Sequence, residues 1–267
     1  MSIGYVAMLD VLGFSDLLAR DGEGDHLEKY LAHLGVALND TVVGPPVDSV
    51  VFSDSIVLTT KDNSEAELHA LLLRCSRAFG LLLQNGIALR GAIAHGPFYR
   101  NVTPSGTFVA GRAILDAYNF ERLQDWVGIM IAPSTLKQAR SFIEQVSNFM
   151  DLQAGNADNL KRIREITPVA AFVQRCNGIP FQPTHPLGNR TFEGYAIVPT
   201  DGVSNVNSIV QSFDLSYKAL EGLRAIAPTP EAQTKYQRSS QWMSRIHWRW
   251  RDIAHWEKRF EEEAQGK

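Results

Sequence analysis

Cysteine is scarce in this chain, because Cys75 and Cys176 are the only two in 267 residues. Two cysteines can form neither a disulfide framework nor a cysteine zinc site. A chain without such cross-links is typical of a reducing compartment. We therefore expect a cytoplasmic location.

Long apolar runs and a strong net charge are also missing. No apolar run approaches the roughly 20 residues of a membrane-spanning helix, and the N-terminus lacks the features of a signal peptide. The formal net charge is −3, whereas a dedicated nucleic-acid-binding protein is usually basic. We expect neither a membrane nor a nucleic acid among the partners.

Apolar residues make up 45% of the chain, which is enough for one large domain or a core domain with an extension. Periodicity and turn signals predict elements in the order strand, helix, hairpin, helix, strand, extended arm, helix, strand. This order favours an α+β fold, with an antiparallel or mixed sheet and helices packed on one face. The predicted elements are 5–12, 14–39, 50–59, 67–84, 87–94, 98–108, 110–123 and 127–131.

The signal weakens after about residue 145. Residues 177–190 are rich in Gly, Pro, Asn and His and indicate an irregular loop, and 192–198 is a plausible strand. Helices are predicted at 203–226 and 230–263. We divide the chain into a core, 1–145, and a mainly helical C-terminal extension, 146–267, packed on it.

Two aspartates occupy unusual places. Asp10 lies inside the apolar run Tyr5–Leu12, and Asp54 lies at the tip of the hairpin Val50–Thr59. A charged side chain in a buried strand is costly unless something positive neutralises it. If the two strands are neighbours, the carboxylates converge, and Mg²⁺ or Mn²⁺ is the economical partner. The alternative is that both aspartates cap turns or helices.

A pair of such cations, ~3.5–4 Å apart, would activate an attacking oxygen and stabilise a leaving phosphate. The residues alone therefore point to metal-dependent phosphoryl or nucleotidyl chemistry. Segment 106–113 has the glycine spacing of a P-loop but lacks its Lys and Ser/Thr. The helix start at Ala110 can still hold an anion, with Arg112 as a phosphate ligand or as a solvated surface residue.

Two further features have competing interpretations. His95 ends a strand and is either a general base or, as we favour, a structural histidine. Segment 242–260, rich in Trp and Arg, either stacks on single-stranded nucleic acid or, as we favour, docks its helix on the core.

Taken in order, four segments resemble the catalytic domain of the class III nucleotidyl cyclases over residues 3–135. They are LDVLGF with Asp10, FSDS with Asp54, LRGAIAHG at 89–96, and a glycine followed by an alanine-rich helix. The resemblance implies a ferredoxin-like core and a head-to-tail homodimer with active sites at its interface. It also implies two divalent cations, held by Asp10, Asp54 and the backbone carbonyl of Val11.

The departures from the purine cyclases are informative. Their catalytic Asn and Arg on the helix after the arm fall here at Leu115 and Asn119, and their two base-reading positions fall at Val50 and Phe108. A site built on polar readout loses its preference when those groups become apolar. The sequence is most similar to the bacterial pyrimidine cyclases of the Pycsar antiphage systems, which make cyclic UMP or cyclic CMP to activate a separate effector protein.

The resemblance therefore implies a uridylate cyclase that produces a second messenger for antiviral defence, with a cytidylate cyclase as the alternative. Arg112, or Arg100 reaching across a dimer, would join the two acids in catalysis. Phe52 would stack on the base, and Asn119 would contact the substrate. Two other classes stay open: a degenerate cyclase fold that senses a nucleotide without turnover, and a metal-dependent phosphatase or nuclease.

Overall fold

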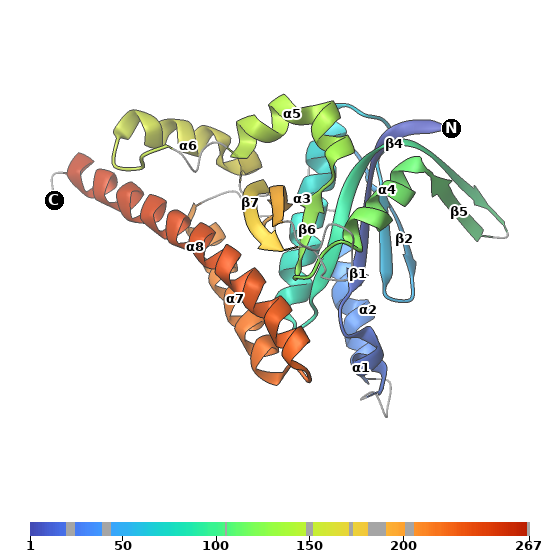
Figure 1. The fold of residues 1–267 in the computed structure, drawn as a ribbon. Helices are drawn as coiled ribbons and strands as arrows, with labels where there is room; N and C mark the ends of the chain where they lie inside the picture. The colour runs from blue at the N-terminus through green and yellow to red at the C-terminus, as the bar shows by residue number, and fades with distance from the viewer. Residues whose placement is uncertain are drawn as a thin grey trace.

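The computed structural model describes residues 1–19, 25–38, 44–104, 106–147, 152–170, 173–180, 191–200 and 206–265. These residues form a mixed eight-stranded sheet in the order β2-β3-β1-β4-β6-β8-β7, with β5 paired to β4 (Figure 1). The strands are β1 (Ser2–Val11), β2 (Asp48–Phe52), β3 (Ser55–Thr59), β4 (Leu89–Thr103), β5 (Gly106–Gly111), β6 (Gly128–Ile131), β7 (Val173–Pro180) and β8 (Thr191–Ile197).

Helix α3 follows the apolar periodicity of the sequence closely, whereas the helix predicted over 14–39 is described as α1 and α2, and α6 was not predicted. In α3 the side chain of Ser64 accepts from the backbone N–H of Glu67 and caps the start, and Asn85 and Gly86 end the helix as predicted. The helices are α1 (Phe14–Ala19), α2 (Asp25–Leu38), α3 (Glu65–Gln84), α4 (Arg112–Glu121), α5 (Pro133–Ser147), α6 (Ala157–Ala170), α7 (Val206–Ile226) and α8 (Pro230–Ala264). Among the described residues, no helix has the length and apolar character needed to span a membrane.

The first four strands form a ferredoxin-like unit. Strands β2, β3, β1 and β4 lie in that order, and each neighbouring pair is antiparallel. Helix α2 lies between β1 and β2 in the chain, and α3 lies between β3 and β4. This connectivity is the β-α-β-β-α-β motif. Strand β6 then pairs with β4 in parallel and makes the sheet mixed. The predicted α+β fold with a mixed sheet is confirmed.

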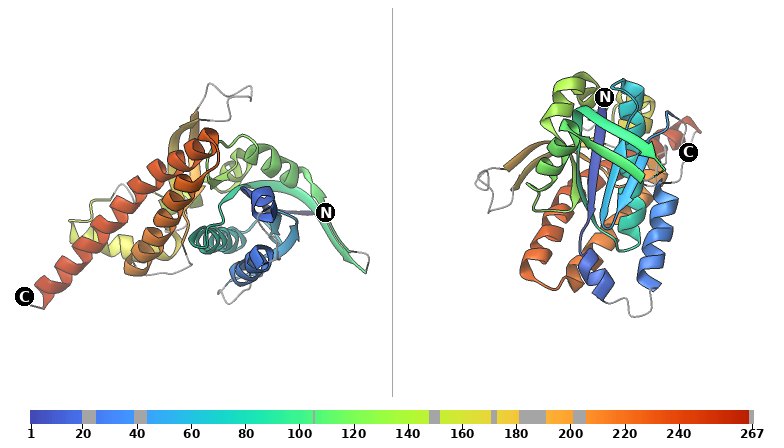
Figure 2. Two further views of the ribbon diagram at one scale, coloured as in Figure 1. Left: turned by 90° about the horizontal axis from the view of Figure 1, so that it is seen from below. Right: turned by 90° about the vertical axis from the view of Figure 1, so that its right-hand side faces the viewer.

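Helices cover both faces of the sheet, so the prediction that they pack on one face is wrong. Leu9 of β1 belongs to the main core together with Leu72 of α3. Val6, which points to the other face, packs with Ala113 of α4. Figure 2 shows α3 and α4 on opposite sides of the strands. The cause is the near-continuous apolar run Tyr5–Leu12, because a strand without polar alternation needs cover on both faces.

The C-terminal part continues the same sheet. Strand β8 pairs antiparallel with β6, and β7 pairs with β8. Helix α7 packs on α3, and α8 packs on α7. In α8 Trp242 and Trp250 are buried, whereas Trp248 is 72% exposed. Most of the aromatic surface of α8 thus docks the helix, as favoured above. The division at residue 145 stays a prediction.

Gly91 sets how closely β4 approaches β1. A Cβ atom at this position would lie 2.6 Å from the Met8 carbonyl oxygen and 2.6 Å from Leu9 Cδ2. We expect Gly91→Ala to lower the free energy of unfolding by about 1–3 kcal/mol, because the strand has no room for a methyl group. Urea denaturation followed by circular dichroism measures the change.

The matched control is Gly222→Ala, at an exposed site in α7 where a Cβ meets nothing within 4 Å. This variant should gain roughly 0.5–1 kcal/mol, since alanine is the better helix former. Equal stabilities for the two variants would contradict the close packing of β1 on β4.

Candidate functional site

Asp10 and Asp54 lie side by side, although 44 positions separate them in the sequence. Strands β1 and β3 pair antiparallel, and Asp10 stands opposite Ser55. The backbone N–H of Val11 donates to the carbonyl of Asp54 over 3.0 Å. Ser53, before Asp54 in the hairpin turn, has φ +56°, the left-handed conformation that tight hairpin turns require. The structure thus joins the three residues predicted to hold metal. Their role stays a prediction.

Arg90 supplies a positive charge for Asp10. The two residues are partners in the β1–β4 register, and Arg90 Nη2 lies 3.2 Å from Asp10 Oδ2. The Nε side of the same guanidinium forms an ion pair with Glu121 at the end of α4. A cation that neutralises Asp10 was expected from the sequence, but Arg90 was not identified as that cation. Arg90 is a lone charge at the start of an apolar strand, so the argument applied to Asp10 would have found it.

The site has an excess of negative charge. Burial raises the pKa of Asp10, and the charge of Asp54 raises it further, whereas Arg90 lowers it. Burial also raises the pKa of Glu121, with Arg90 again opposing and Asp10 adding. Arg90 pairs with two of these carboxylates, Asp10 and Glu121, and Asp54 adds a third negative charge beside Asp10. The uncompensated charge favours a cation next to Asp10 and Asp54.

Tyr30 of α2 brings a buried hydroxyl to the same region. Its side chain is 1% exposed, and its hydroxyl has no hydrogen-bond partner among the described residues. Burial raises the pKa of Tyr30 to about 12, and the negative charges of Asp54 and Asp10 contribute. An orphaned buried hydroxyl is unusual, because such groups normally have a partner. The sequence analysis did not single out Tyr30, whose only signal was the helical spacing of its apolar neighbours.

The donor set suits a divalent cation. Carboxylate oxygens are the ligands that Mg²⁺ and Mn²⁺ prefer. The single hydrogen bond from Arg90 uses only part of the acceptor capacity of Asp10. In the described part of the chain no group of three or more His, Cys, Asp or Glu residues can hold a metal ion. Ions at Asp10 and Asp54 would therefore take their remaining ligands from a bound substrate or water.

The two arginines predicted to assist catalysis lie away from the acids of their own chain. Arg100 is ten residues beyond Arg90 on β4, roughly 33 Å at the rise of an extended strand. It pairs with Asp48 at 3.1 Å. Arg112 begins the helix that Glu121 ends, about 14 Å apart along the axis.

The predicted substrate-binding residues are also spread out. Phe52 ends β2 beside the hairpin turn and is 81% exposed. Asn119 lines a separate cavity of about 310 Å³ between α4 and Ala132–Ser134, together with Asp116. Asp116 accepts a hydrogen bond from Arg112 at 2.7 Å, and Arg112 is 69% exposed. Within one chain, only Phe52 lies near the two acids.

His95 has a structural environment. It stands opposite Tyr5 in the β1–β4 register, and the two rings lie 5.1 Å apart. Burial lowers its pKa, which favours the neutral form. It is five positions along β4 from Arg90, about 17 Å by strand rise, so the favoured structural interpretation suits this geometry.

No protein-family model and no curated protein matches this chain. Several solved structures are similar to it, among them three nucleotide cyclases. The guanylyl cyclase domain of the RhoGC fusion protein from the fungus Blastocladiella emersonii has 16% identity and a TM-score of 0.37, over 53% of this chain and 85% of that one. The guanylate cyclase domain of RhGC from Catenaria anguillulae, in complex with GTP, has 12% identity and a TM-score of 0.40, over 74% and 97%. The adenylyl cyclase CyaB from P. aeruginosa has 13% identity and a TM-score of 0.41, over 73% and 92%. At these values the likeness decides nothing about activity, substrate or partners.

Glu121 competes with Asp10 for the guanidinium of Arg90. We expect Glu121→Gln to lower the pKa of Asp10, because the variant removes a negative charge and leaves Arg90 to pair with Asp10 alone. In a ¹³C NMR titration, the carboxyl signal of Asp10 should move at a lower pH than in the parent protein.

The control is Glu144→Gln, an exposed carboxylate that pairs with Arg140 on α5. It should leave the titration of Asp10 unchanged. An unchanged or raised pKa of Asp10 in Glu121→Gln would show that the two acids do not share Arg90.

Proposed function

We propose that the protein is a class III nucleotidyl cyclase that converts a pyrimidine nucleoside triphosphate, with UTP favoured, into its 3′,5′-cyclic monophosphate and pyrophosphate. The observation that carries the proposal is the adjacency of Asp10 and Asp54, with negative charge that Arg90 alone does not balance. Two oxygen-ligand residues at the junction of two strands suit substrate phosphates that arrive with divalent cations.

Two divalent cations, Mg²⁺ or Mn²⁺, would lower the pKa of the ribose 3′-hydroxyl and offset the charge of the departing pyrophosphate. Asp10, Asp54 and the carbonyl of Val11 would hold them. In the reaction the ribose 3′-hydroxyl would give its proton to water, and its oxygen would bond to the α-phosphorus. The bond from the α-phosphorus to the oxygen that bridges to the β-phosphorus breaks, and pyrophosphate leaves. Arg90 keeps Asp10 ionised and oriented through its hydrogen bond.

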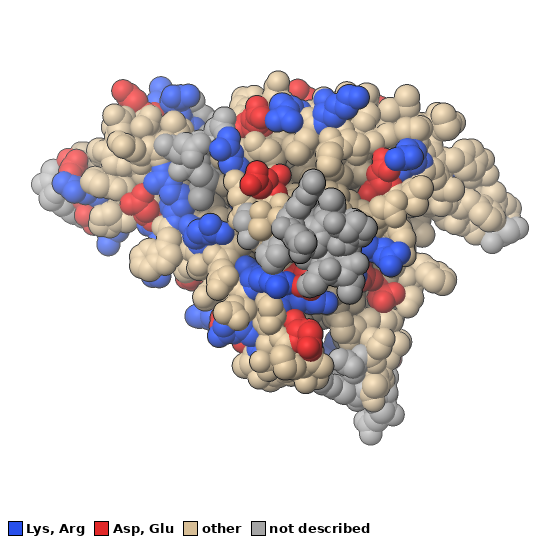
Figure 3. All heavy atoms as spheres, viewed as in Figure 1, with Lys and Arg blue, Asp and Glu red and all other residues tan. Residues whose placement is uncertain are grey.

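A homodimer would complete the site. Arg100 and Arg112 are remote from the acids of their own chain. In a dimer, the arginines of one subunit would contact the substrate that is bound at Asp10 and Asp54 of the other. Large apolar side chains are exposed on the strands and helix that would face it, where a partner would bury them. They are Ile3, Phe52, Tyr99, Val102, Phe108, Leu115 and Tyr118. Figure 3 shows the arm formed by β4 and β5 as a nearly uncharged surface.

The choice of base rests on the apolar positions where purine cyclases have polar readers. These positions are Val50 of β2, which is half-buried, and Phe108 of β5, which is 56% exposed and so available to a substrate held between two copies. Apolar groups give a purine edge no hydrogen bonds, which disfavours ATP and GTP. Uracil and cytosine have the same size and differ only in which of two neighbouring groups, at ring positions 3 and 4, is the hydrogen-bond donor and which the acceptor. The cytidylate cyclase is therefore the alternative.

The product would be a second messenger in antiviral defence, made in the cytoplasm and read by a separate effector protein. Two other activities use the same residues. A degenerate fold would bind a nucleotide without turnover. This alternative rests on Leu115 and Asn119, which stand where purine cyclases have their catalytic Asn and Arg. A phosphatase or nuclease would use Asp10 and Asp54 to hold metal for attack by water. Each makes a different set of products.

Incubation with each of the four NTPs and Mn²⁺, followed by mass spectrometry, tests the proposal. We expect cyclic UMP as the main product. In Asp54→Ala the turnover number for cyclisation should fall at least 100-fold, since each carboxylate is needed to hold the cations. Asp158→Ala, an exposed acid on α6, is the control and should keep full turnover.

Each other outcome has a definite meaning. Mainly cyclic CMP would support the alternative substrate. Hydrolysis to mono- or diphosphates would support the phosphatase, and bound nucleotide without product would support the sensor. Cyclic AMP or cyclic GMP as the main product would contradict the assignment of the base readers.

Subunit mixing tests whether the arginines act across a dimer. We expect Arg100→Ala and Asp54→Ala each to be inactive alone. Mixed in equal amounts, they should regain roughly a quarter of parent activity, because half of the dimers are mixed and each has one intact site. Arg112→Ala is tested in the same way. Full turnover by an arginine variant alone would remove that arginine from the site.

A further inference from the structure

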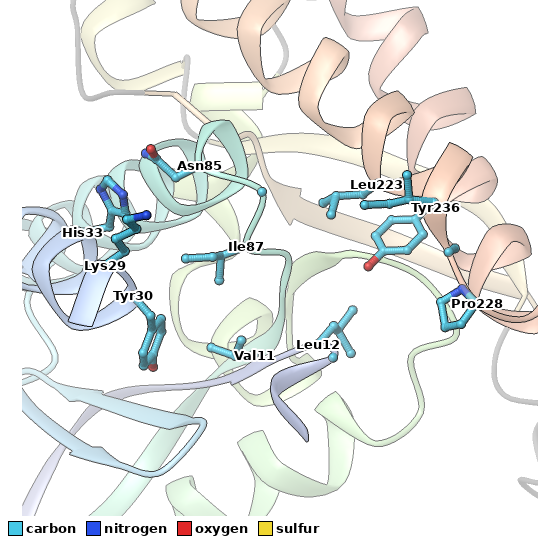
Figure 4. Close-up of a pocket in the computed structure, with 14 residues that line it drawn as sticks. Val11, Leu12, Lys29, Tyr30, His33, Asn85, Ile87, Leu223, Pro228 and Tyr236 are labelled. Atoms are coloured by element: carbon cyan, nitrogen blue, oxygen red, sulfur yellow. The ribbon is translucent and has the colours of Figure 1, made fainter. Parts of the chain in front are cut away.

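A cavity of about 290 Å³ lies behind the two acids, where the C-terminal helices meet the core. Its walls come from the end of β1, from α2, from the turn after α3, and from the connection between α7 and α8 (Figure 4). Most of the wall is apolar, and the volume is near the lower end of the range for small-molecule sites. The apolar wall includes Leu12, Ile87, Leu223, Ile226 and Pro228.

One end of the cavity is basic. Lys29 and His33 are one turn apart on α2, and Figure 4 shows their side chains together at the same side of the cavity. Among the described residues, neither side chain has an acidic partner within ion-pair distance. Asn85, at the end of α3, lies beside them. A cluster with nitrogen donors and an apolar wall next to it matches an anion that has an apolar body.

The opposite wall is supplied by the C-terminal helices. Tyr236 of α8 points its hydroxyl toward the open space in Figure 4. Ala227, in the short connection between α7 and α8, also lines the cavity. The helical hairpin therefore forms one wall of the cavity, which stays partly open to solvent.

Two residues belong both to the cavity and to the acidic site. Val11 lines the cavity, and its backbone N–H donates to the carbonyl of Asp54. Tyr30 also lines the cavity, and its buried hydroxyl interacts electrostatically with Asp54 and Asp10. Val11 and Tyr30 thus connect the wall of the cavity to the acidic site.

We propose that this cavity binds a small organic anion with an apolar, aromatic body, and that binding is linked to the Asp10–Asp54 site through Val11 and Tyr30. The charge would face Lys29 and His33, and the body would pack on the apolar wall. The linkage rests on the proposed function, because it requires a cation at the acids, whereas the binding does not.

The probe is 1-anilinonaphthalene-8-sulfonate, an aromatic anion whose fluorescence rises in apolar sites, compared with its uncharged parent N-phenyl-1-naphthylamine. We expect saturable binding of the anion to the full-length protein without metal or nucleotide. Lys29→Gln combined with His33→Gln should weaken the anion about tenfold, the loss of one charge-assisted contact. The uncharged probe should be unaffected. Lys137→Gln, an exposed lysine on α5, is the control.

Ala227→Trp tests where the probe sits. The indole would fill the cavity, so both probes should lose their site, with circular dichroism to verify the fold. Ala157→Trp, at the exposed start of α6, is the matched control and should bind as the parent does. Parent affinity in Ala227→Trp, or equal loss of both probes in the Lys29 and His33 variant, would overturn the proposed anion site.

The linkage is tested by titrating the anion with and without Mg²⁺. We expect its affinity to change at least fivefold in the parent protein and not at all in Asp54→Ala. An unchanged affinity in the parent overturns the linkage. Anion binding in a protein that makes no cyclic nucleotide would support the cavity while the proposed function fails, so the two failures are distinguishable.

Discussion

The candidate site depends on the ion pair between Asp10 and Arg90. Both residues interrupt apolar stretches, Asp10 in Tyr5–Leu12 and Arg90 in Ile87–Ala94, where a charge without a partner is costly. The antiparallel register of β1 and β4 puts them opposite each other, and α4 adds Glu121 on the far side of the guanidinium. One cation thus holds two carboxylates, and the hairpin turn contributes a third in Asp54. This arrangement keeps a carboxylate in the centre of a sheet and still leaves negative charge for a ligand.

The close packing of β1 on β4 holds that ion pair in register. The C-terminal part packs against α3 and extends the same sheet. The Ser76 hydroxyl of α3 donates to the Val198 carbonyl over 2.5 Å, and a Cβ at Gly80 would meet the Thr200 carbonyl oxygen at 2.3 Å. Strand β8 then continues the sheet beyond β6. The segment after residue 145 is therefore in direct contact with the core, and its helical hairpin forms one wall of the cavity that Val11 and Tyr30 also line.

Much of the fold could be predicted, because local patterns carry it. The apolar run of β1, the hairpin β2–β3, the helix α3 with its Asn85–Gly86 stop, and the arm all follow from periodicity and turn residues. Strand β7 was not predicted, since its segment VQRCNGIP alternates poorly and resembles a loop. The prediction of helices on one face failed because it weighed element order above the two-sided apolar character of β1.

The candidate site divides in the same way. Asp10 and Asp54 were found because each breaks a local pattern, a charge in an apolar strand and an acid at a hairpin tip. Arg90 breaks a local pattern in the same way and was overlooked, whereas Glu121 and Tyr30 were missed because their importance comes only from the residues that they meet. Arg100 and Arg112 were grouped with the acids by resemblance, and in a single chain they lie elsewhere.

By itself the sequence determined the class of fold, most elements of the core and the two unusual aspartates, since these depend on neighbours a few positions apart. Only the tertiary structure decided which charge balances Asp10, which hydroxyl lies near it, and where the C-terminal helices leave a cavity. The physical reason is that strand register and helix docking are set by packing over the whole chain, and pairs of residues tens of positions apart leave no local signal.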